Sequence, residues 1–381
     1  MAGLAEAVKP PAFPPLDSIE SALWPGVVVL VFAVTAVMVD VMIILSTRFR
    51  LVDLPNRRSA HALPTARGGG IAIVIMVCVS ALLTVFRWPQ LVPRVLLGVI
   101  LPGLVIAGVG IVDDIRPLRP SLRLVIQVAV AALMTAVLQP LQGIRLSGIG
   151  EVGFGPFAWP LTMIWIVGMI NAYNFIDGSD GMAGLAGVVV GTAMAAVGLE
   201  AGSLAAMLLA AFAAAASGGF LVFNWQPARV FMGDVGSSFL GLCFGAIPLL
   251  FAQPRSDTFL PAILCLWPYV YDTLLSVVRR LWHRRNPFQP HREFLFHRLI
   301  RSGVNHADAA LLYGIMSAFG GLLGFAMVDP AAPPVLRDGA PVLIAVLAFM
   351  MTFFIERRCR QVGLPSAATA YSSALQEPPC T

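Results

Sequence analysis

The sequence predicts an all-α membrane protein that crosses the bilayer about eleven times. Of its 381 residues, 58% are hydrophobic and only 12% are charged, whereas a soluble domain carries about 25% charged residues. Apolar runs close to the roughly 20 residues that a helix needs to cross the hydrocarbon core recur along the chain. We expect membrane spans at residues 25–46, 70–87, 94–112, 122–139, 157–173, 182–199, 203–223, 237–252, 258–278, 309–328 and 340–356.

The arginines predict which side of the membrane each loop occupies. All 25 basic residues except Lys9 are arginines, and 19 of the 25 fall in the loops after odd-numbered spans, within two residues of such a loop, or in the C-terminal segment. Because basic residues accumulate in cytoplasmic loops, we expect these segments in the cytoplasm and the N-terminus in the periplasm.

This orientation predicts three parts of the chain. Residues 1–24 form a periplasmic segment, and residues 357–381 form a cytoplasmic tail whose composition predicts disorder. Residues 25–356 form the transmembrane domain. Its cytoplasmic loops are expected at 47–69, 113–121, 173–181, 224–236 and 279–308.

Composition argues against a nucleic-acid-binding protein and against a zinc-binding or disulfide-rich protein. The basic residues lie in short loops between apolar spans, which predicts no nucleic-acid partner and an attraction to anionic headgroups or phosphates instead. The five cysteines show no CxxC or Cys/His spacing, so neither a zinc site nor a disulfide framework is expected.

The first cytoplasmic loop ends in Thr65-Ala-Arg67-Gly68-Gly69-Gly70. Glycines before a helix let backbone N–H groups approach an anion closely, and arginines add charge-assisted contacts to phosphate. The alternative is a flexible basic loop that only sets topology.

Adjacent carboxylates, Asp113 and Asp114, follow the third span. Two such groups at a membrane border repel each other and are costly to desolvate. They are tolerated beside a divalent cation or a cationic ligand, and one of them could accept a proton from a substrate. A helix-ending turn neutralised by Arg116 and Arg119 is the alternative.

A third pattern places Asn171, Asn174, Asp177 and Asp180 around glycines between the fifth and sixth spans. Carboxylate and amide oxygens suit Mg²⁺, which binds one or two carboxylates and keeps several waters. They also suit hydrogen bonds to a base and a ribose. A tight turn in which Asp180 caps the next helix is the alternative.

A fourth pattern begins at Asn224 and reaches Gly233-Asp234-Val-Gly236-Ser237. Asp234 lies between glycines just before a helix start, where it could hold a metal that bridges a diphosphate. The alternative is a capping residue with glycines that permit the turn.

The longest cytoplasmic loop interleaves basic and aromatic residues and includes His291, Arg292 and His297. These side chains are candidates for binding a sugar or phosphates, with solvated histidines as the alternative. Asp272, near the end of the ninth span, is a functional candidate because intramembrane carboxylates usually are. It could instead pair with Arg279 or Arg280.

Four of these patterns occur in order on one predicted membrane face: PTxRGGG at 64–70, the Asp pair at 113–114, NAxNFxDGxDG at 171–181 and NxxPAxxFMGDxGS at 224–237. Together they resemble the polyprenyl-phosphate N-acetylhexosamine-1-phosphate transferases, the MraY/WecA-like members of glycosyltransferase family 4. The resemblance covers roughly residues 48–300.

This resemblance implies roles for individual residues. It implies that Asp234 ligates Mg²⁺, with Mn²⁺ as an alternative ion, and that Asp177 also contacts the metal. Asp113, with Asp114 beside it, would be the base or the partner of the lipid phosphate. The resemblance implies substrate contacts for Thr65, Arg67, Gly69, Asn171, Asn174, Asp177, Asp180, Asn224, His291, Arg292 and His297.

The implied reaction transfers an N-acetylhexosamine 1-phosphate from a UDP-sugar to undecaprenyl phosphate and releases UMP. It would take place at the cytoplasmic face of a bacterial inner membrane and begin O-antigen or another envelope polysaccharide. Ile176 stands where the muramoyl-pentapeptide branch usually has Thr, which favours the surface-polysaccharide branch. Phe294 stands where that branch has a histidine, so the sequence does not identify the sugar.

Three alternatives stay open at this point. The chain could be a phospho-N-acetylmuramoyl-pentapeptide transferase of peptidoglycan synthesis. It could be a secondary transporter, since many spans and buried acids fit one, although transporters place polar sites near the bilayer midplane. It could also be a non-catalytic membrane scaffold. The sequence leaves the oligomeric state undetermined.

Overall fold

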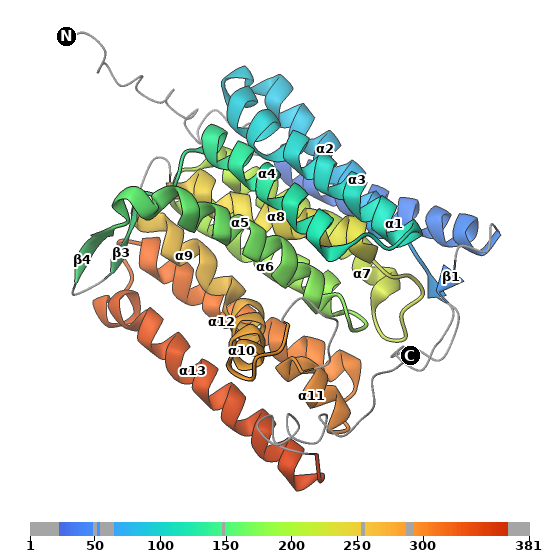
Figure 1. The fold of residues 1–381 in the computed structure, drawn as a ribbon. Helices are drawn as coiled ribbons and strands as arrows, with labels where there is room; N and C mark the ends of the chain where they lie inside the picture. Colours follow the sequence, from blue (N-terminus) through green and yellow to red (C-terminus); the bar gives the residue numbers. More distant parts are fainter. Residues whose placement is uncertain are drawn as a thin grey trace.

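The computed structural model describes residues 23–48, 52–53, 65–146, 149–252, 256–286 and 293–364. Helices make up most of these residues, and two short antiparallel hairpins complete them. Strands β1 (Val52–Asp53) and β2 (Thr65–Ala66) form one hairpin, and β3 (Gly143–Leu146) and β4 (Gly150–Gly153) form the other. Figure 1 shows β1 at one end of the helices and the β3–β4 hairpin at the opposite end.

Thirteen α-helices follow one another within the described residues. They are α1 (Leu23–Arg48), α2 (Gly70–Arg87), α3 (Leu101–Ile115), α4 (Pro120–Leu138), α5 (Ala158–Ile176), α6 (Met182–Glu200), α7 (Leu204–Asn224), α8 (Gly233–Ala252), α9 (Phe259–Ile263), α10 (Trp267–Trp282), α11 (Leu295–Arg301), α12 (His306–Val328) and α13 (Pro334–Gln361). A π-helical stretch, Val92–Ile100, leads directly into α3, and a 3₁₀ turn, Leu264–Leu266, joins α9 to α10.

Eleven helical segments of the described chain are long and apolar enough to cross a membrane. They coincide with the eleven predicted spans, so the prediction of an all-α polytopic membrane protein is confirmed. The last helix differs from its prediction at both ends, because α13 begins at Pro334 and continues to Gln361. The first residues of the predicted disordered tail are therefore helical, and residues 365–381 lie outside the described part of the chain.

Helix α8 forms the centre of the bundle. Helices α2, α3, α5 and α7 pack around it, and every residue from Val235 to Phe251 is buried. A helix that is apolar on all sides can be stable only inside a protein or a membrane. The burial of α8 therefore fixes its N-terminus, which carries Asp234, against the ends of its neighbours.

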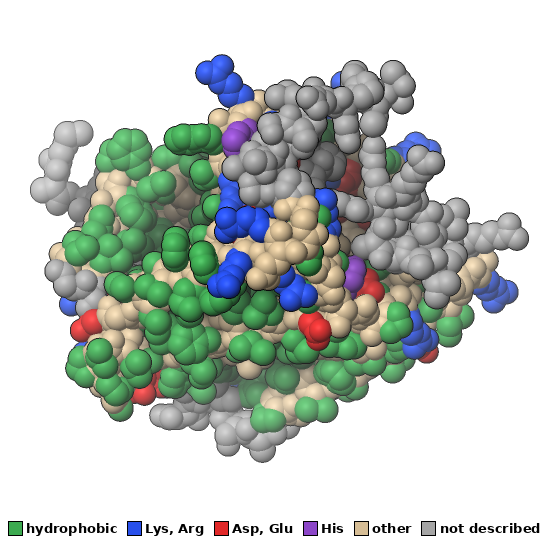
Figure 2. All heavy atoms as spheres, turned by 90° about the horizontal axis from the view of Figure 1, so that it is seen from below, with side chains coloured by type: hydrophobic (Ala, Val, Ile, Leu, Met, Phe, Trp, Pro, Cys, Tyr) green, Lys and Arg blue, Asp and Glu red, His purple; other side chains and the backbone are tan. Residues whose placement is uncertain are grey.

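The outer helices present apolar side chains to their surroundings. Val29 of α1, Val125 of α4 and Phe349 of α13 are among the large hydrophobic residues that are exposed. Figure 2 shows one face of the molecule on which hydrophobic side chains cover much of the surface around a group of arginine side chains. Such an apolar belt is the surface expected to contact lipid.

Glycines allow the helices around the start of α8 to approach closely. A Cβ on Gly110 would lie 2.5 Å from the Cα of Val235, and a Cβ on Gly70 would lie 2.5 Å from the Cα of Gly236. Small residues of this kind let the backbones of membrane helices come into contact. They hold the ends of α2 and α3 directly against the N-terminal turn of α8.

A Gly110→Ala substitution tests this close approach. The added methyl group would collide with the α8 backbone, so we expect a loss of about 1–3 kcal/mol of stability and a thermal unfolding temperature several degrees lower in detergent. Gly108→Ala is the matched control, because a Cβ on Gly108 of the same helix meets no atom within 4 Å. Equal melting temperatures for the two variants would contradict the packing described here.

Candidate active site

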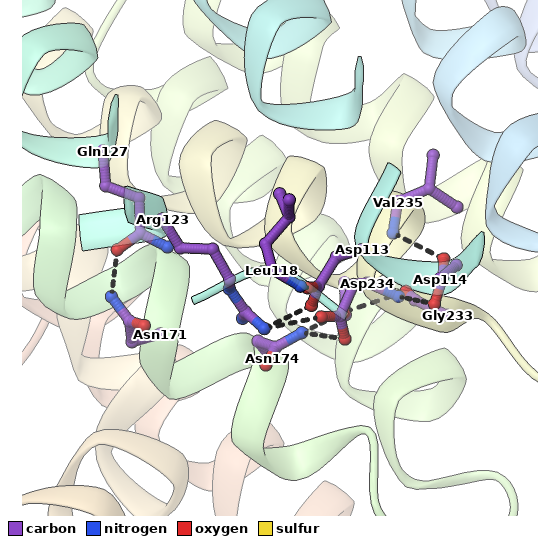
Figure 3. Close-up of polar contacts among 11 residues, drawn as sticks. Asp113, Asp114, Leu118, Arg123, Gln127, Asn171, Asn174, Gly233, Asp234 and Val235 are labelled. Atoms are coloured by element: carbon purple, nitrogen blue, oxygen red, sulfur yellow. Dashed lines mark hydrogen bonds and ion pairs between the residues drawn. The ribbon is translucent and has the colours of Figure 1, made fainter. Parts of the chain in front are cut away.

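The Asp114 carboxylate, at the end of α3, caps the N-terminus of α8. Its Oδ1 accepts a hydrogen bond from the Asp234 N–H at 3.1 Å, and its Oδ2 accepts one from the Val235 N–H at 3.3 Å (Figure 3). The first N–H groups of a helix have no partner within the helix, and here a carboxylate of another helix supplies it. Gly233 has a φ of 74°, and a Cβ there would lie 2.6 Å from Asp114 Oδ2.

Two neighbouring side chains orient the Asp234 and Asp113 carboxylates. Asn174 Nδ2 donates to Asp234 Oδ1 at 2.8 Å and also to Ser237 Oγ at 2.9 Å. Arg123 Nη1 lies 3.0 Å from Asp234 Oδ2 and pairs with Asp113 Oδ2 as well (Figure 3). One guanidinium nitrogen therefore joins carboxylates that come from α3 and α8.

Asp177 follows the last residue of α5 and is partly buried. Burial raises the pKa of its carboxyl well above the usual value, and the charges of Asp234 and Asp114 raise the pKa further, against a hydrogen bond with the Gly233 backbone. Asp113, Asp114, Asp177 and Asp234 are called the carboxylate cluster below. The structure thus brings together acids that are separated by up to 121 residues in sequence.

The carboxylate cluster carries more negative than positive charge. Arg123 contacts two of the acids, and Arg67 attracts Asp114 electrostatically. Four carboxylates against these two guanidiniums leave two negative charges to be compensated when all four are ionised. Like charges at this spacing favour a proton or a cation at the site.

The carboxylate oxygens of the cluster fit a magnesium ion that keeps some of its waters better than a metal ion ligated only by protein side chains. Among the described residues, no three or more His, Cys, Asp and Glu side chains are grouped closely enough to hold a metal on their own. Mg²⁺ needs only one or two carboxylates because it keeps several of its waters. Asp234 and Asp177 supply oxygens of this kind, with Asp113 beside them.

Asn224 and Asp180 tie two of the motif loops together. Asn224 is 2% exposed, and its Oδ1 accepts from the Gly181 N–H while its Nδ2 donates to the Val230 carbonyl. Asp180 Oδ2 accepts from the Ala228 N–H at 3.1 Å. These contacts give both side chains a bracing role, and their predicted contact with substrate stays a prediction.

The glycine-rich end of the first loop lies along the segment before α8. The Gly69 N–H donates to the Phe231 carbonyl at 3.1 Å, the Gly70 N–H donates to the Met232 carbonyl at 3.0 Å, and the Phe231 N–H donates to the Ala66 carbonyl. Both glycine N–H groups are thus already used within the protein. A direct anion contact at Gly69 stays a prediction.

The two other predicted residues of this loop lie beside the same segment. Thr65 is buried in β2, and the Arg67 side chain is exposed while its carbonyl accepts from Ser46 Oγ. The predicted contact of Arg67 with an anionic substrate stays a prediction.

Helix α11 places the last loop against the Asp177–Gly181 turn. His297 Nε2 lies 3.1 Å from the position that a Cβ on Gly178 would occupy, and Phe294 packs on Phe175 with their ring centroids 5.4 Å apart. Phe294, which stands in the place of the family histidine, is therefore a buried packing group. His291 and Arg292 lie outside the described residues.

Asp272 anchors α11 from within the bundle. It is 1% exposed, and its carboxylate accepts from the Leu295 N–H at 2.6 Å, the Phe296 N–H at 3.1 Å and the Tyr313 hydroxyl at 2.7 Å. The ion pairs of Arg279 and Arg280 are with Glu356 and Glu293, and of the two expected partners only Arg279 acts on Asp272, through its charge. Asp272 acts by holding the N-terminus of α11 in place.

Sequence reasoning missed Arg123, Gln127 and His306. Arg123 takes the place expected for Arg116 and Arg119 as the counter-ion of the Asp pair. Gln127, one turn further along α4, accepts from Asn171 Nδ2 at 2.7 Å. The sequence did mark Arg123 and Gln127 as candidates, because polar residues inside an apolar span are costly and usually functional.

His306 begins α12 and contacts the turn after α5. Its Nδ1 lies 3.0 Å from Ser179 Oγ and accepts from the Asp180 N–H at 3.3 Å. No sequence pattern singled it out, since a lone histidine at a helix start has many ordinary explanations.

An apolar cavity of about 700 Å³ lies between α4, α5 and α10. Asn171 and Thr273 are the polar side chains of its lining, which otherwise includes Leu124, Val128, Trp165, Phe175, Leu274 and Val277. Asn171 bonds to Gln127, which lies one helical turn from Arg123. The cavity therefore runs along the membrane helices, and its lining includes Leu124, next to Arg123, and Asn171, about one turn before Asn174.

Comparisons with known proteins support a single family. Residues 96–252 match the model of glycosyl transferase family 4. A decaprenyl-phosphate N-acetylglucosaminephosphotransferase of Mycolicibacterium smegmatis is 32% identical over 71% of this chain and 73% of its own length. The chain belongs to glycosyl transferase family 4.

Other members of the family match over more of the chain. A Bacillus subtilis protein named "Probable undecaprenyl-phosphate N-acetylglucosaminyl 1-phosphate transferase" is 29% identical over 82% of this chain and 85% of its own length. The undecaprenyl-phosphate alpha-N-acetylglucosaminyl 1-phosphate transferase of Yersinia pestis is 27% identical over 82% and 86%. These names favour the predicted branch over muramoyl-pentapeptide transfer, and the family argues against a transporter or a scaffold.

An Asp272→Ala substitution tests the anchoring of α11. Removing the carboxylate leaves two N–H groups and the Tyr313 hydroxyl without their partner, so we expect a loss of about 3 kcal/mol of stability and faster proteolysis within residues 283–305. Asp338→Ala is the control, because Asp338 is an exposed residue of α13. Unchanged melting and proteolysis in Asp272→Ala would contradict the assigned role.

Proposed function

We propose that the chain transfers an N-acetylhexosamine 1-phosphate from a UDP-sugar to undecaprenyl phosphate and releases UMP. The observation that carries this proposal is the carboxylate cluster, which lies beside an apolar cavity running along the membrane helices. A polar, metal-compatible site next to an apolar cavity matches an enzyme that joins a water-soluble donor to a lipid acceptor. The names of the family relatives support the same reaction.

The site is proposed to face the cytoplasm of a bacterial inner membrane. The ends of α3, α5 and α7 and the start of α8 meet at the carboxylate cluster, and the loops on that side hold most of the arginines. Basic residues accumulate on the cytoplasmic side. Nucleotide-sugars are made there, so this orientation gives the site access to its donor.

The residues of the site divide the work of phosphoryl transfer. Bound at Asp234 and Asp177, Mg²⁺ would neutralise charge on the donor diphosphate and polarise the phosphorus. Asn174 fixes the orientation of the Asp234 carboxylate. Asp113 is placed to orient the acceptor phosphate or to accept its proton. Positioning and charge compensation of this kind supply most of the rate acceleration in phosphoryl transfer.

The apolar cavity is proposed to hold the polyprenyl chain. Its lining side chains come from α4, α5 and α10, which also span the membrane. A lipid bound there would keep its tail in the bilayer while its phosphate reaches the carboxylate cluster past Asn171 and Gln127. The acceptor would then not need to leave the membrane.

The donor sugar is proposed to be N-acetylglucosamine or a close N-acetylated relative. The relatives are named for N-acetylglucosamine phosphate transfer. In this chain, however, Phe294 is buried where a histidine is expected, so the last loop offers a different surface near Gly178. The product would be the first lipid-linked sugar of an O-antigen or another envelope polysaccharide.

Asp234→Asn and Asp113→Asn should each abolish UMP release from membranes supplied with UDP-N-acetylglucosamine and undecaprenyl phosphate. Each substitution removes a negative charge that the reaction requires at the cluster. Asp338→Asn, an exposed acid of α13, is the control and should retain activity. Mass spectrometry of the lipid product from a panel of UDP-sugars identifies the donor. Turnover at the wild-type rate in either cluster variant would refute the assigned roles.

The concentration of Mg²⁺ that gives half-maximal activity should fall as the pH rises. The pKa of Asp177 is raised by burial and by its acidic neighbours, so at low pH a proton competes with the cation for this carboxylate. At higher pH the carboxylate is ionised and binds the cation without losing a proton. Steady-state rates over a Mg²⁺ series at each pH measure this, and a half-maximal concentration independent of pH would contradict it.

A further inference from the structure

Arg123 binds the carboxylate cluster through a single nitrogen. Nη1 contacts both Asp113 Oδ2 and Asp234 Oδ2, and the other two nitrogens of the guanidinium have no polar partner among the described residues. A strong Arg–carboxylate pair uses two parallel N–H···O bonds. The Arg123 side chain is also 25% exposed, so it is a partly solvated cation at the edge of the site that is held through one nitrogen.

The oxygen that Arg123 holds is the one best placed for a metal. Asn174 occupies Asp234 Oδ1, which leaves Oδ2 as the freer oxygen of that carboxylate, and Arg123 Nη1 lies 3.0 Å from it. Asp113 is similar, because the Leu118 N–H takes its Oδ1 and Arg123 takes its Oδ2. A cation held by Asp234 and Asp177 that uses Asp234 Oδ2 must take the place of the guanidinium at that oxygen, with Asp113 Oδ2 next to it.

The charge balance favours such an exchange. One guanidinium brings a single positive charge to two carboxylates, whereas a divalent cation at the same place neutralises both. The Arg123 side chain is 25% exposed, so it can turn towards solvent when it is displaced.

We propose that Arg123 is a resident counter-cation: it holds Asp113 and Asp234 together in the metal-free protein and releases them when a divalent cation binds. Without a positive charge between them, the two carboxylates would repel each other and loosen the contact between α3 and α8. Arg123 thus preserves the shape of the site at the expense of metal affinity. This inference rests on the divalent cation of the proposed function.

Binding of Mn²⁺ to the purified full-length protein in detergent, with no substrate present, tests this exchange. Electron paramagnetic resonance of free Mn²⁺ gives the affinity. Arg123→Gln removes the competing charge, so we expect Mn²⁺ to bind about tenfold more tightly than in the wild type. Arg123→Lys keeps a competing cation and should stay near the wild-type affinity. Arg116→Gln is the matched control, because Arg116 is exposed and lies at the end of α3.

Thermal unfolding supplies a second readout that does not depend on turnover. Arg123→Gln should unfold at a lower temperature than the wild type without metal, and Mg²⁺ should raise its unfolding temperature by more than it raises that of the wild type. Equal or weaker Mn²⁺ binding by Arg123→Gln, together with an equal Mg²⁺ shift, would overturn the proposal and leave the proposed metal site standing. Failure of the wild type and every variant to bind either ion would overturn both.

Discussion

The start of α8 is the point on which the rest of the site depends. Its first N–H groups need a partner, and the Asp114 carboxylate of α3 provides it. This bond between two helices can form only because Gly110 and Gly233 lack side chains where the backbones meet. Asp234, one residue into α8, is consequently held among acids from α3 and α5. The rest of this central helix is buried from Val235 to Phe251, which restricts movement of its N-terminus.

Several motif residues support the site instead of facing a substrate. Asn224 and Asp180 connect the turn after α5 to the segment before α8, and Asp272 fixes the start of α11. Buried polar groups of this kind are satisfied by backbone partners, and losing one leaves those partners unpaired. Loss of activity after mutation of such a residue therefore does not by itself identify a catalytic role. The distinction has to come from stability measured alongside turnover.

The carboxylate cluster lies near the apolar cavity, which suits a reaction between a water-soluble donor and a lipid acceptor. Carboxylates are expensive inside a bilayer, so they gather where the helices end and where Arg67 and Arg123 balance part of their charge. The cavity between α4, α5 and α10 stays apolar up to Asn171. The change from apolar to charged surroundings occurs within about one and a half turns of α4, from Val128 through Gln127 to Arg123.

Hydropathy by itself determined the eleven spans, because the length of an apolar run is a local property of the chain. The order and composition of the loop motifs determined the grouping of acids on one membrane face and the family. The sequence also identified Asp113, Asp114, Asp177 and Asp234 as members of one site. Only the tertiary structure decided what each group does there: that Asp114 caps α8, that Arg123 and not Arg116 or Arg119 joins the acids, and that Phe294 is buried. These outcomes depend on how α3, α4, α5 and α8 pack against one another, and spacing along the chain does not encode that geometry.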